Sequence, residues 1–238
     1  MRQKRMLFLA PGLKVFRDFV FLTCNMTRKE RYAFVINYFE IHRPLAETEL
    51  KFEDPYELLV ATILSAQCTD KRVNMITPAL FAKYATVKSM SAATFDDLFP
   101  IIKSISYPNN KTKHLIGMAI KVMEQFRGTI PMTVDELVQL PGVGRKTANV
   151  VTSVIDRQPN MAVDTHVFRV SRRIGLVPQA ANTPLAVEKE LIKNFPRELI
   201  HKAHHWLILH GRYTCLARNP KCGECGIKKV CPYFRHSS

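Results

Sequence analysis

Signals for the start of a helix recur along almost the whole chain, and they exclude most other folds. Thr27 followed by Glu30 forms a capping-box pattern ahead of an expected helix over residues 31–42. Asp54 before Pro55 opens a second expected helix, which runs to about residue 66. No run of alternating apolar and polar residues is long enough to indicate a sheet. The sequence therefore predicts an all-α fold, with further helices over residues 115–126, 145–156, 164–174, 184–194 and 197–210.

The net charge of the chain limits the classes of partner that it is expected to bind. The 238 residues contain 35 Lys and Arg against 20 Asp and Glu, a formal net charge of +15, with an ordinary apolar share of 47%. A folded chain this basic favours a polyanion, usually nucleic acid, although an anionic membrane surface or a plainly basic protein would give the same sum. No segment reaches the ~18 unbroken apolar residues of a membrane span. We therefore expect a nucleic-acid partner and no membrane.

The first 25 residues differ from the rest of the chain. Basic residues at positions 2, 4 and 5 precede an apolar run over 6–13, a pattern that faintly resembles a secretory signal. Pro11 and Gly12 interrupt that run, and charged residues follow where a cleavage region would lie. We expect the functional chain to start at Met26, and residues 1–25 to be an extension without function or a mis-assigned start.

The most specific motif is Leu-Pro-Gly-Val-Gly-Arg-Lys-Thr-Ala over residues 140–148. It follows a short expected helix, whose start is indicated by the capping-box pattern of Thr133 and Glu136. Unpaired N–H groups at the start of the next helix favour a phosphate, and glycine lets that anion approach closely. An ordinary helix–helix turn would also contain two glycines. The cations that follow favour a helix-hairpin-helix, which grips the DNA backbone without reading sequence. The expected DNA contacts in this motif are Gly142, Val143, Gly144 and Arg145.

Lys146 lies in the first turn of the helix expected after this motif. The positive end of the helix dipole disfavours an ammonium ion there, and partial burial would add to this effect. A neutral amine is a nucleophile that can form a Schiff base with a carbonyl carbon. A lysine at this position could equally do no more than bind a phosphate. From the residues alone, the two roles carry equal weight.

Asp164 opens the expected helix over residues 164–174. It is an N-cap by residue type and position. Its carboxylate can also face a reaction centre, where it would move a proton or stabilise a developing sugar cation. His166 admits three roles: a contact to a DNA phosphate, support for Asp164, or an interior histidine whose hydrogen bonds are satisfied. The last two are favoured together, and His166 is kept among the candidate DNA contacts.

Four of the six cysteines crowd into the last 24 residues, at Cys215, Cys222, Cys225 and Cys231. A secreted disulfide framework would spread its cysteines through the fold, so this grouping indicates one metal or cluster site in a reducing compartment. Four thiolates suit either tetrahedral zinc or a four-iron cluster, and intervals of six, two and five residues leave the metal open. The metal would brace a basic loop in which Arg218 and Lys221 bind phosphate.

Three segments of the chain resemble the endonuclease III family of bifunctional DNA glycosylase/AP lyases. They cover residues 140–151, 163–170 and 204–215, and the similarity extends over about residues 28–233. The cysteine intervals match the family's iron–sulfur loop over residues 215–231, so the resemblance implies a [4Fe–4S] cluster rather than zinc. Three separate motifs agree in order and spacing, which makes chance a poor explanation.

The resemblance implies two helical lobes with DNA bound in the cleft between them. A six-helix lobe that contains the helix-hairpin-helix would span residues 48–158. The second lobe would be discontinuous, joining residues 27–47 to residues 159–238, and would carry the cluster.

The resemblance also implies roles for single residues. Lys146 falls on the family's nucleophilic lysine, and Asp164 falls on its catalytic aspartate. Gln67 falls on the glutamine that fills the gap left by an extruded nucleotide, although a surface amide at a helix end would look the same. Tyr107 would be the inserted residue of the wedge loop. Over residues 105–111 this chain departs from the family's usual glycine, apolar residue and aromatic, which leaves the opposite-base preference open.

The expected activity is removal of oxidised pyrimidines from duplex DNA, followed by β-elimination that cuts the strand 3′ to the site through a lysine Schiff base. Two alternatives stay open: a monofunctional glycosylase of the same superfamily, which would lack the lysine, and a non-catalytic helix-hairpin-helix module that only binds DNA. We expect a monomer in the cytoplasm, associated with the nucleoid if bacterial. Its partner would be double-stranded DNA that contains damaged bases or abasic sites.

Overall fold

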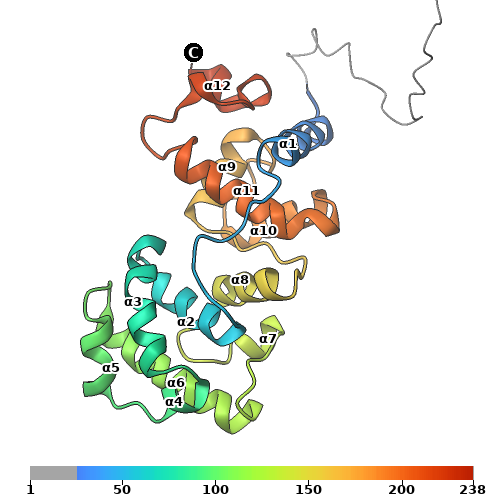
Figure 1. Cartoon of the computed structure of the whole chain (residues 1–238). Helices are drawn as coiled ribbons and strands as arrows, with labels where there is room; N and C mark the ends of the chain where they lie inside the picture. Colours follow the sequence, from blue (N-terminus) through green and yellow to red (C-terminus); the bar gives the residue numbers. More distant parts are fainter. Residues whose placement is uncertain (1–25, 238) are drawn as a thin grey trace, which may run out of the picture.

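The computed structural model describes residues 26–237 and shows two groups of helices, one above the other in Figure 1. Within this range there is no strand, which confirms the all-α class. None of the helices in the same range is both long enough and apolar enough to cross a bilayer. The segment over residues 1–25, which we expect to have no function, lies outside the described residues.

The helices follow one another with short connections. The α-helices are α1 Arg28–His42, α2 Pro55–Ser65, α3 Asp70–Lys83, α4 Val87–Ser91, α5 Phe95–Ile102, α6 Pro108–Phe126, α7 Val134–Leu137, α8 Arg145–Ile155, α9 Thr165–Ile174, α10 Pro184–Asn194, α11 Ile200–Tyr213 and α12 Pro232–Ser237. Three 3-10 turns accompany them: η1 Arg197–Leu199, η2 Cys222–Glu224 and η3 Lys228–Val230.

Side-chain caps set the starts of several helices where the sequence predicts them. Thr27 and Glu30 form a reciprocal capping box. The helix α1 begins at Arg28, directly after the N-cap Thr27 and three residues before the expected start. The helix expected over residues 184–194 matches α10 at both ends. The one expected over residues 197–210 begins instead as the 3-10 turn η1 and then continues as α11.

The first lobe is built around α2. Asp54 caps its start by accepting the Glu57 N–H at 2.8 Å. Its sequence is apolar on nearly every side, and eight of its 11 residues are buried. A helix of this kind has to lie inside a protein. Accordingly α3, α6 and α8 pack against it, and the core that they share runs from Leu50 to Val151.

The second lobe joins α1 to helices from the end of the chain (Figure 1). Phe39 of α1 and Trp206 of α11 are both fully buried and stack with ring centroids 5.7 Å apart. The Trp206 indole N–H donates to the carbonyl of Arg43 at 2.9 Å, which fixes α11 to the chain that leaves α1. From residue 26 onward, the chain therefore begins in this lobe, passes through the first lobe, and returns.

The two hydrophobic cores are separate, and the sequence positions between their members indicate where one lobe ends and the other begins. The first core begins at Leu50, whereas the second ends its N-terminal part at Ala46 and resumes at Met161. We propose residues 48–158 as one structural domain, and residues 27–47 with 159–238 as the other.

Candidate active site and cluster centre

The turn between α7 and α8 depends on glycine at one position in particular. Gly142 has a φ of +78°, in the left-handed region that residues with a Cβ rarely adopt. A Cβ there would lie 2.8 Å from the Cβ of His114, closer than two such atoms can come. Gly144 is the N-cap of α8, and a Cβ there would meet nothing within 4 Å. A phosphate can therefore approach the start of α8 from this side.

Replacing Gly142 by alanine is expected to destabilise the protein by about 3 kcal/mol, because the new methyl group meets His114 and the backbone is strained. Gly144→Ala is the matched control. It adds the same methyl group in open space at an ordinary φ of −92°, so it should lose only the preference for glycine over alanine at an N-cap, about 1 kcal/mol or less. Thermal unfolding of both variants tests this. Equal losses of stability in the two would contradict the account.

Lys146 and Asp164 face the same hollow between the lobes. Both residues line two adjoining pockets, a larger one of about 800 Å³ and a smaller one of about 70 Å³. The walls of these pockets come from α2, α3 and the start of α8 on one side, and from α9 and α11 on the other. Two residues that are 18 positions apart in the sequence are thus brought to one site.

Asp164 caps α9, as its residue type predicts. Its Oδ1 atom accepts the N–H of Val167 at 2.7 Å, and the residue is half-buried. Within the described part of the chain, Oδ2 takes part in no hydrogen bond. One oxygen therefore holds the helix while the other is free to act on a substrate.

Lys146 is exposed at the rim of the pockets, so the partial burial considered from the sequence is not found in the free protein. Beside it, His204 of α11 is 1% exposed. Burial, together with the positive charge of Lys146, lowers the pKa of His204 to about 4. The imidazole next to Lys146 is therefore neutral at neutral pH.

A group of charged residues that the sequence analysis did not identify lines the same pockets as Lys146 and Asp164. Arg212, at the end of α11, donates to Asp70 Oδ2 at 2.6 Å and also to Glu49, which accepts the hydroxyl of Tyr213 as well. These bonds connect the second lobe to α3 and to the chain before α2. Arg212 lies in the segment over residues 204–215 noted in the sequence, and Asp70 lies three positions after Gln67. No local pattern indicates a pair that is 142 positions apart.

Two candidate DNA contacts have protein partners that the sequence did not indicate. The Arg145 guanidinium pairs with Glu188 of α10, with Nη2 and Oε1 2.6 Å apart, and this carboxylate is buried. The Nδ1 atom of His166 lies 3.2 Å from Arg169 Nη2. No hydrogen bond joins His166 to Asp164 in the described chain, so the support expected for that carboxylate is not a direct contact.

The two residues expected to enter the DNA helix lie on neighbouring loops. Gln67 follows α2, is exposed and lines the larger pocket. Tyr107 precedes α6 and its side chain stands out from the surface, 61% exposed. The hydroxyl of Ser106 donates to the carbonyl of Gln67 at 2.8 Å, which joins the two loops.

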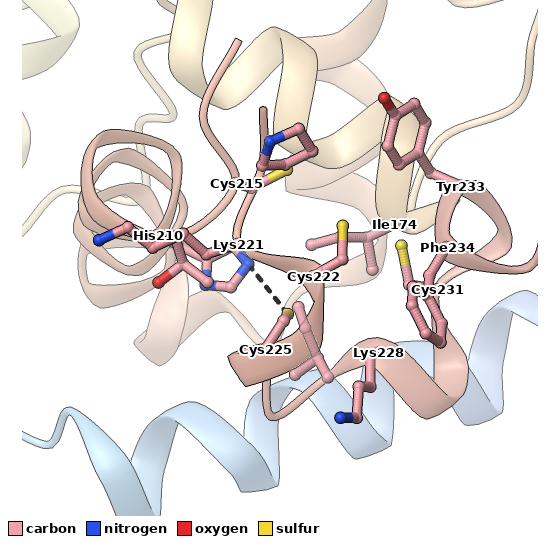
Figure 2. Close-up of a pocket in the computed structure, with 13 residues that line it drawn as sticks. Ile174, His210, Cys215, Lys221, Cys222, Cys225, Lys228, Cys231, Tyr233 and Phe234 are labelled. Carbon is pink, nitrogen blue, oxygen red and sulfur yellow. Dashed lines mark hydrogen bonds between the residues drawn. The ribbon is translucent and has the colours of Figure 1, made fainter. Parts of the chain in front are cut away.

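Four thiols surround one space at the far end of the second lobe (Figure 2). They belong to Cys215, Cys222, Cys225 and Cys231, and none is in a disulfide. Within residues 26–237, no three side chains of the kinds that bind metals converge closely enough for a single ion. Four thiols that line one space are a ligand set that fits either a four-iron cluster or one tetrahedral zinc ion.

The surroundings of these thiols are partly apolar and contain several basic side chains. Burial, with the neighbouring thiols, raises the pKa of Cys225 to about 11. His210 Nε2 lies 3.7 Å from its sulfur, the contact drawn in Figure 2, and burial lowers the pKa of His210 to about 4. Arg173 Nη1 lies 3.7 Å from the sulfur of Cys215. In the loop between the first two cysteines, Arg218 and Lys221 are exposed.

Comparison with known proteins places two family models on the chain. One, described as HhH-GPD superfamily base excision DNA repair protein, matches residues 60–197. The other, described as the iron-sulfur binding domain of endonuclease III, matches residues 215–231 and so covers all four cysteines. The second match settles the choice that the cysteine spacing left open, in favour of an iron–sulfur cluster.

Curated proteins and solved structures agree with these matches. The chain is 45% identical to endonuclease III of Rickettsia felis over 200 residues, which is 84% of this chain and 93% of that protein. It is 43% identical to endonuclease III of Escherichia coli over 192 residues, 81% of this chain and 90% of that one. A trapped endonuclease III–DNA covalent intermediate matches with a TM-score of 0.84 and 40% identity, over 89% of this chain and 99% of that chain.

Proposed function

The chain belongs to the endonuclease III family, and from this membership we propose which of its residues carry out the reaction and on which bases. The protein is a base-excision-repair DNA glycosylase with AP lyase activity. We propose that Lys146 is its nucleophile and that oxidised pyrimidines in duplex DNA are its substrates. The observation that carries this proposal is that Lys146 and Asp164 line one hollow directly beside the helical hairpin.

The proposed reaction begins when the damaged nucleotide is flipped out of the duplex into the hollow, at a cost of a few kcal/mol. The amine of Lys146 forms a bond to C1′ of the sugar as the bond to the base breaks, and Asp164 stabilises the charge that develops on the sugar. Opening of the sugar ring leaves an iminium, a protonated Schiff base. The iminium makes the C2′ proton acidic; loss of that proton expels the 3′ phosphate and cuts the strand.

The cluster has a structural role in this proposal. Four thiolates from Cys215 to Cys231 would hold a [4Fe–4S] cluster, which when bound supplies a rigid centre around which the loop folds. Burial raises the pKa of the Cys225 thiol, so binding of a cluster there would release a proton. The braced loop presents Arg218 and Lys221 to DNA phosphates, and the start of α8 binds a further phosphate at Gly144.

Because these contacts are to phosphates, binding should depend strongly on salt. If about five to six phosphates are neutralised, log K is expected to fall with log salt at a slope of about −5. Removing the charges of both Arg218 and Lys221 should make this slope shallower by about 2. Fluorescence anisotropy with abasic duplex DNA measures both values. A wild-type slope near zero would count against this binding mode.

The proposed substrate class has its own test. Duplexes that carry one oxidised pyrimidine, one oxidised purine or no damage are compared for base release and strand cleavage. We expect release of the oxidised pyrimidine and a cut on its 3′ side, with much slower reaction of the other two duplexes. Faster reaction of the oxidised purine would contradict the proposed class. We further propose that the protein acts as a monomer in the cytoplasm, associated with the nucleoid if bacterial.

A further inference from the structure

Lys111, near the start of α6, is a buried lysine with an unusual set of partners. It is 5% exposed, and its Nζ atom donates to the carbonyl of Leu64 at 2.8 Å and to that of Ala66 at 2.6 Å. Both carbonyls belong to the C-terminal end of α2, which carries the negative end of a helix dipole. The ammonium group therefore caps α2 from a different helix, at the point where the chain turns toward Gln67.

The next carbonyl along the chain is held from the same side. Ser106, which directly precedes Tyr107, donates its hydroxyl to the carbonyl of Gln67 at 2.8 Å. Lys111 lies one helical turn after Tyr107, whose carbonyl accepts the Lys111 N–H at 3.1 Å. Two consecutive carbonyls around Gln67 are thus bound by side chains that lie on either side of Tyr107.

Both residues expected to enter DNA have backbones in the left-handed region. The φ of Gln67 is +54° and that of Tyr107 is +56°. Such a conformation is costly for a residue with a Cβ, and it persists only where the surroundings hold it. At Gln67, the hydrogen bonds to its own carbonyl and to that of Ala66 hold this conformation.

We propose that Ser106 and Lys111 are positioning residues that lock the Gln67 loop and the Tyr107 loop into one rigid unit. This inference rests on the proposed function, because it takes these loops to fill the space that a flipped nucleotide leaves. Preorganised loops reduce the cost of ordering side chains at the moment of insertion. Loss of this unit should therefore slow extrusion of the nucleotide and leave the rate of the chemical step at Lys146 unchanged.

The test compares two substrates that need different amounts of extrusion. One is a fully paired duplex with an oxidised pyrimidine, and the other places the same base in a short mismatch bubble, where it is already unpaired. Single-turnover base release on the paired duplex should fall roughly 5-fold in Ser106→Ala and roughly 30-fold in Lys111→Met. On the bubble, both should stay within about twofold of wild type. Ser106→Thr keeps the hydroxyl and should restore the paired rate.

Matched controls lie next to each position. Ser104 and Lys113 are exposed and make no side-chain hydrogen bond in the described chain. Ser104→Ala and Lys113→Met should leave both rates unchanged. Thermal melting of every variant separates a loss of fold from a loss of extrusion, and Ser106→Ala keeps the test decisive if Lys111→Met is unstable.

A double variant tests whether Ser106 acts by positioning these loops or only by supporting the fold in general. In Gln67→Ala, which should itself slow the paired duplex, adding Ser106→Ala should cost clearly less than the roughly 5-fold loss that it causes in wild type, because one of the two side chains that Ser106 positions is gone. Full additivity, or an equal loss on bubble and paired DNA, would overturn the inference. If wild type fails to release the base from both substrates, the proposed function fails instead, so the two failures are distinguishable.

Discussion

Replacing Lys146 by alanine is expected to abolish strand cleavage at abasic sites, with a loss on the order of 10⁴-fold in the single-turnover rate. The reason is that the proposed covalent path has no other amine: removal of a nucleophile generally removes the whole covalent route rather than a fraction of it. Gel analysis of a duplex with one abasic site measures the rate directly.

Binding and folding of this variant should change little, because Lys146 is exposed and has no ion pair in the described chain. Lys189→Ala, at another exposed lysine, is the matched control and should cleave at the wild-type rate. If Lys146→Ala cleaved within about tenfold of wild type, a different nucleophile would have to be sought.

Replacing Asp164 by asparagine should lower base release by roughly 10²- to 10³-fold while the protein stays folded. Asparagine caps a helix about as well as aspartate does, so the hydrogen bond from Val167 can be kept and the stability should fall by about 0.5 kcal/mol or less. The substitution thus removes the charge and keeps the cap. Base release and thermal unfolding are measured on the same preparation.

The alanine variant at this position completes the design. Asp164→Ala should lose base release to a similar extent, and in addition about 1 kcal/mol of stability, because it has no capping oxygen. Should Asp164→Asn keep the full rate while Asp164→Ala loses it, the aspartate would act only as a cap. Its assignment to the reaction would then be wrong.

Much of the fold could be predicted because short local signals determine where helices begin. Thr27, Asp54 and Thr183 each accept a backbone N–H of the helix that follows. The local sequence signals do not predict the helices α3 and α5. Each contains an interior proline, Pro78 or Pro100, which ordinarily argues against a helix. Packing against α2 and α6 outweighs that local cost.

The site was predicted only in part, for a different physical reason. Lys146, Asp164 and the four cysteines lie in motifs whose spacing can be seen in the sequence. The pairs Arg145–Glu188 and Arg212–Asp70 are 43 and 142 positions apart, and they form only once the lobes have packed. No local sequence pattern indicates either pair. The sequence alone therefore cannot distinguish an arginine that faces DNA from one that holds the two lobes together.

The measurement that tests the central claim most directly is borohydride reduction during the reaction with abasic duplex DNA, followed by mass spectrometry of the trapped peptide. Reduction converts a Schiff base into a stable amine, so it records which residue was joined to the sugar. The account predicts a covalent protein–DNA complex whose adduct lies on Lys146. A complex that maps to any other residue, or DNA binding with no trapped complex, would contradict it.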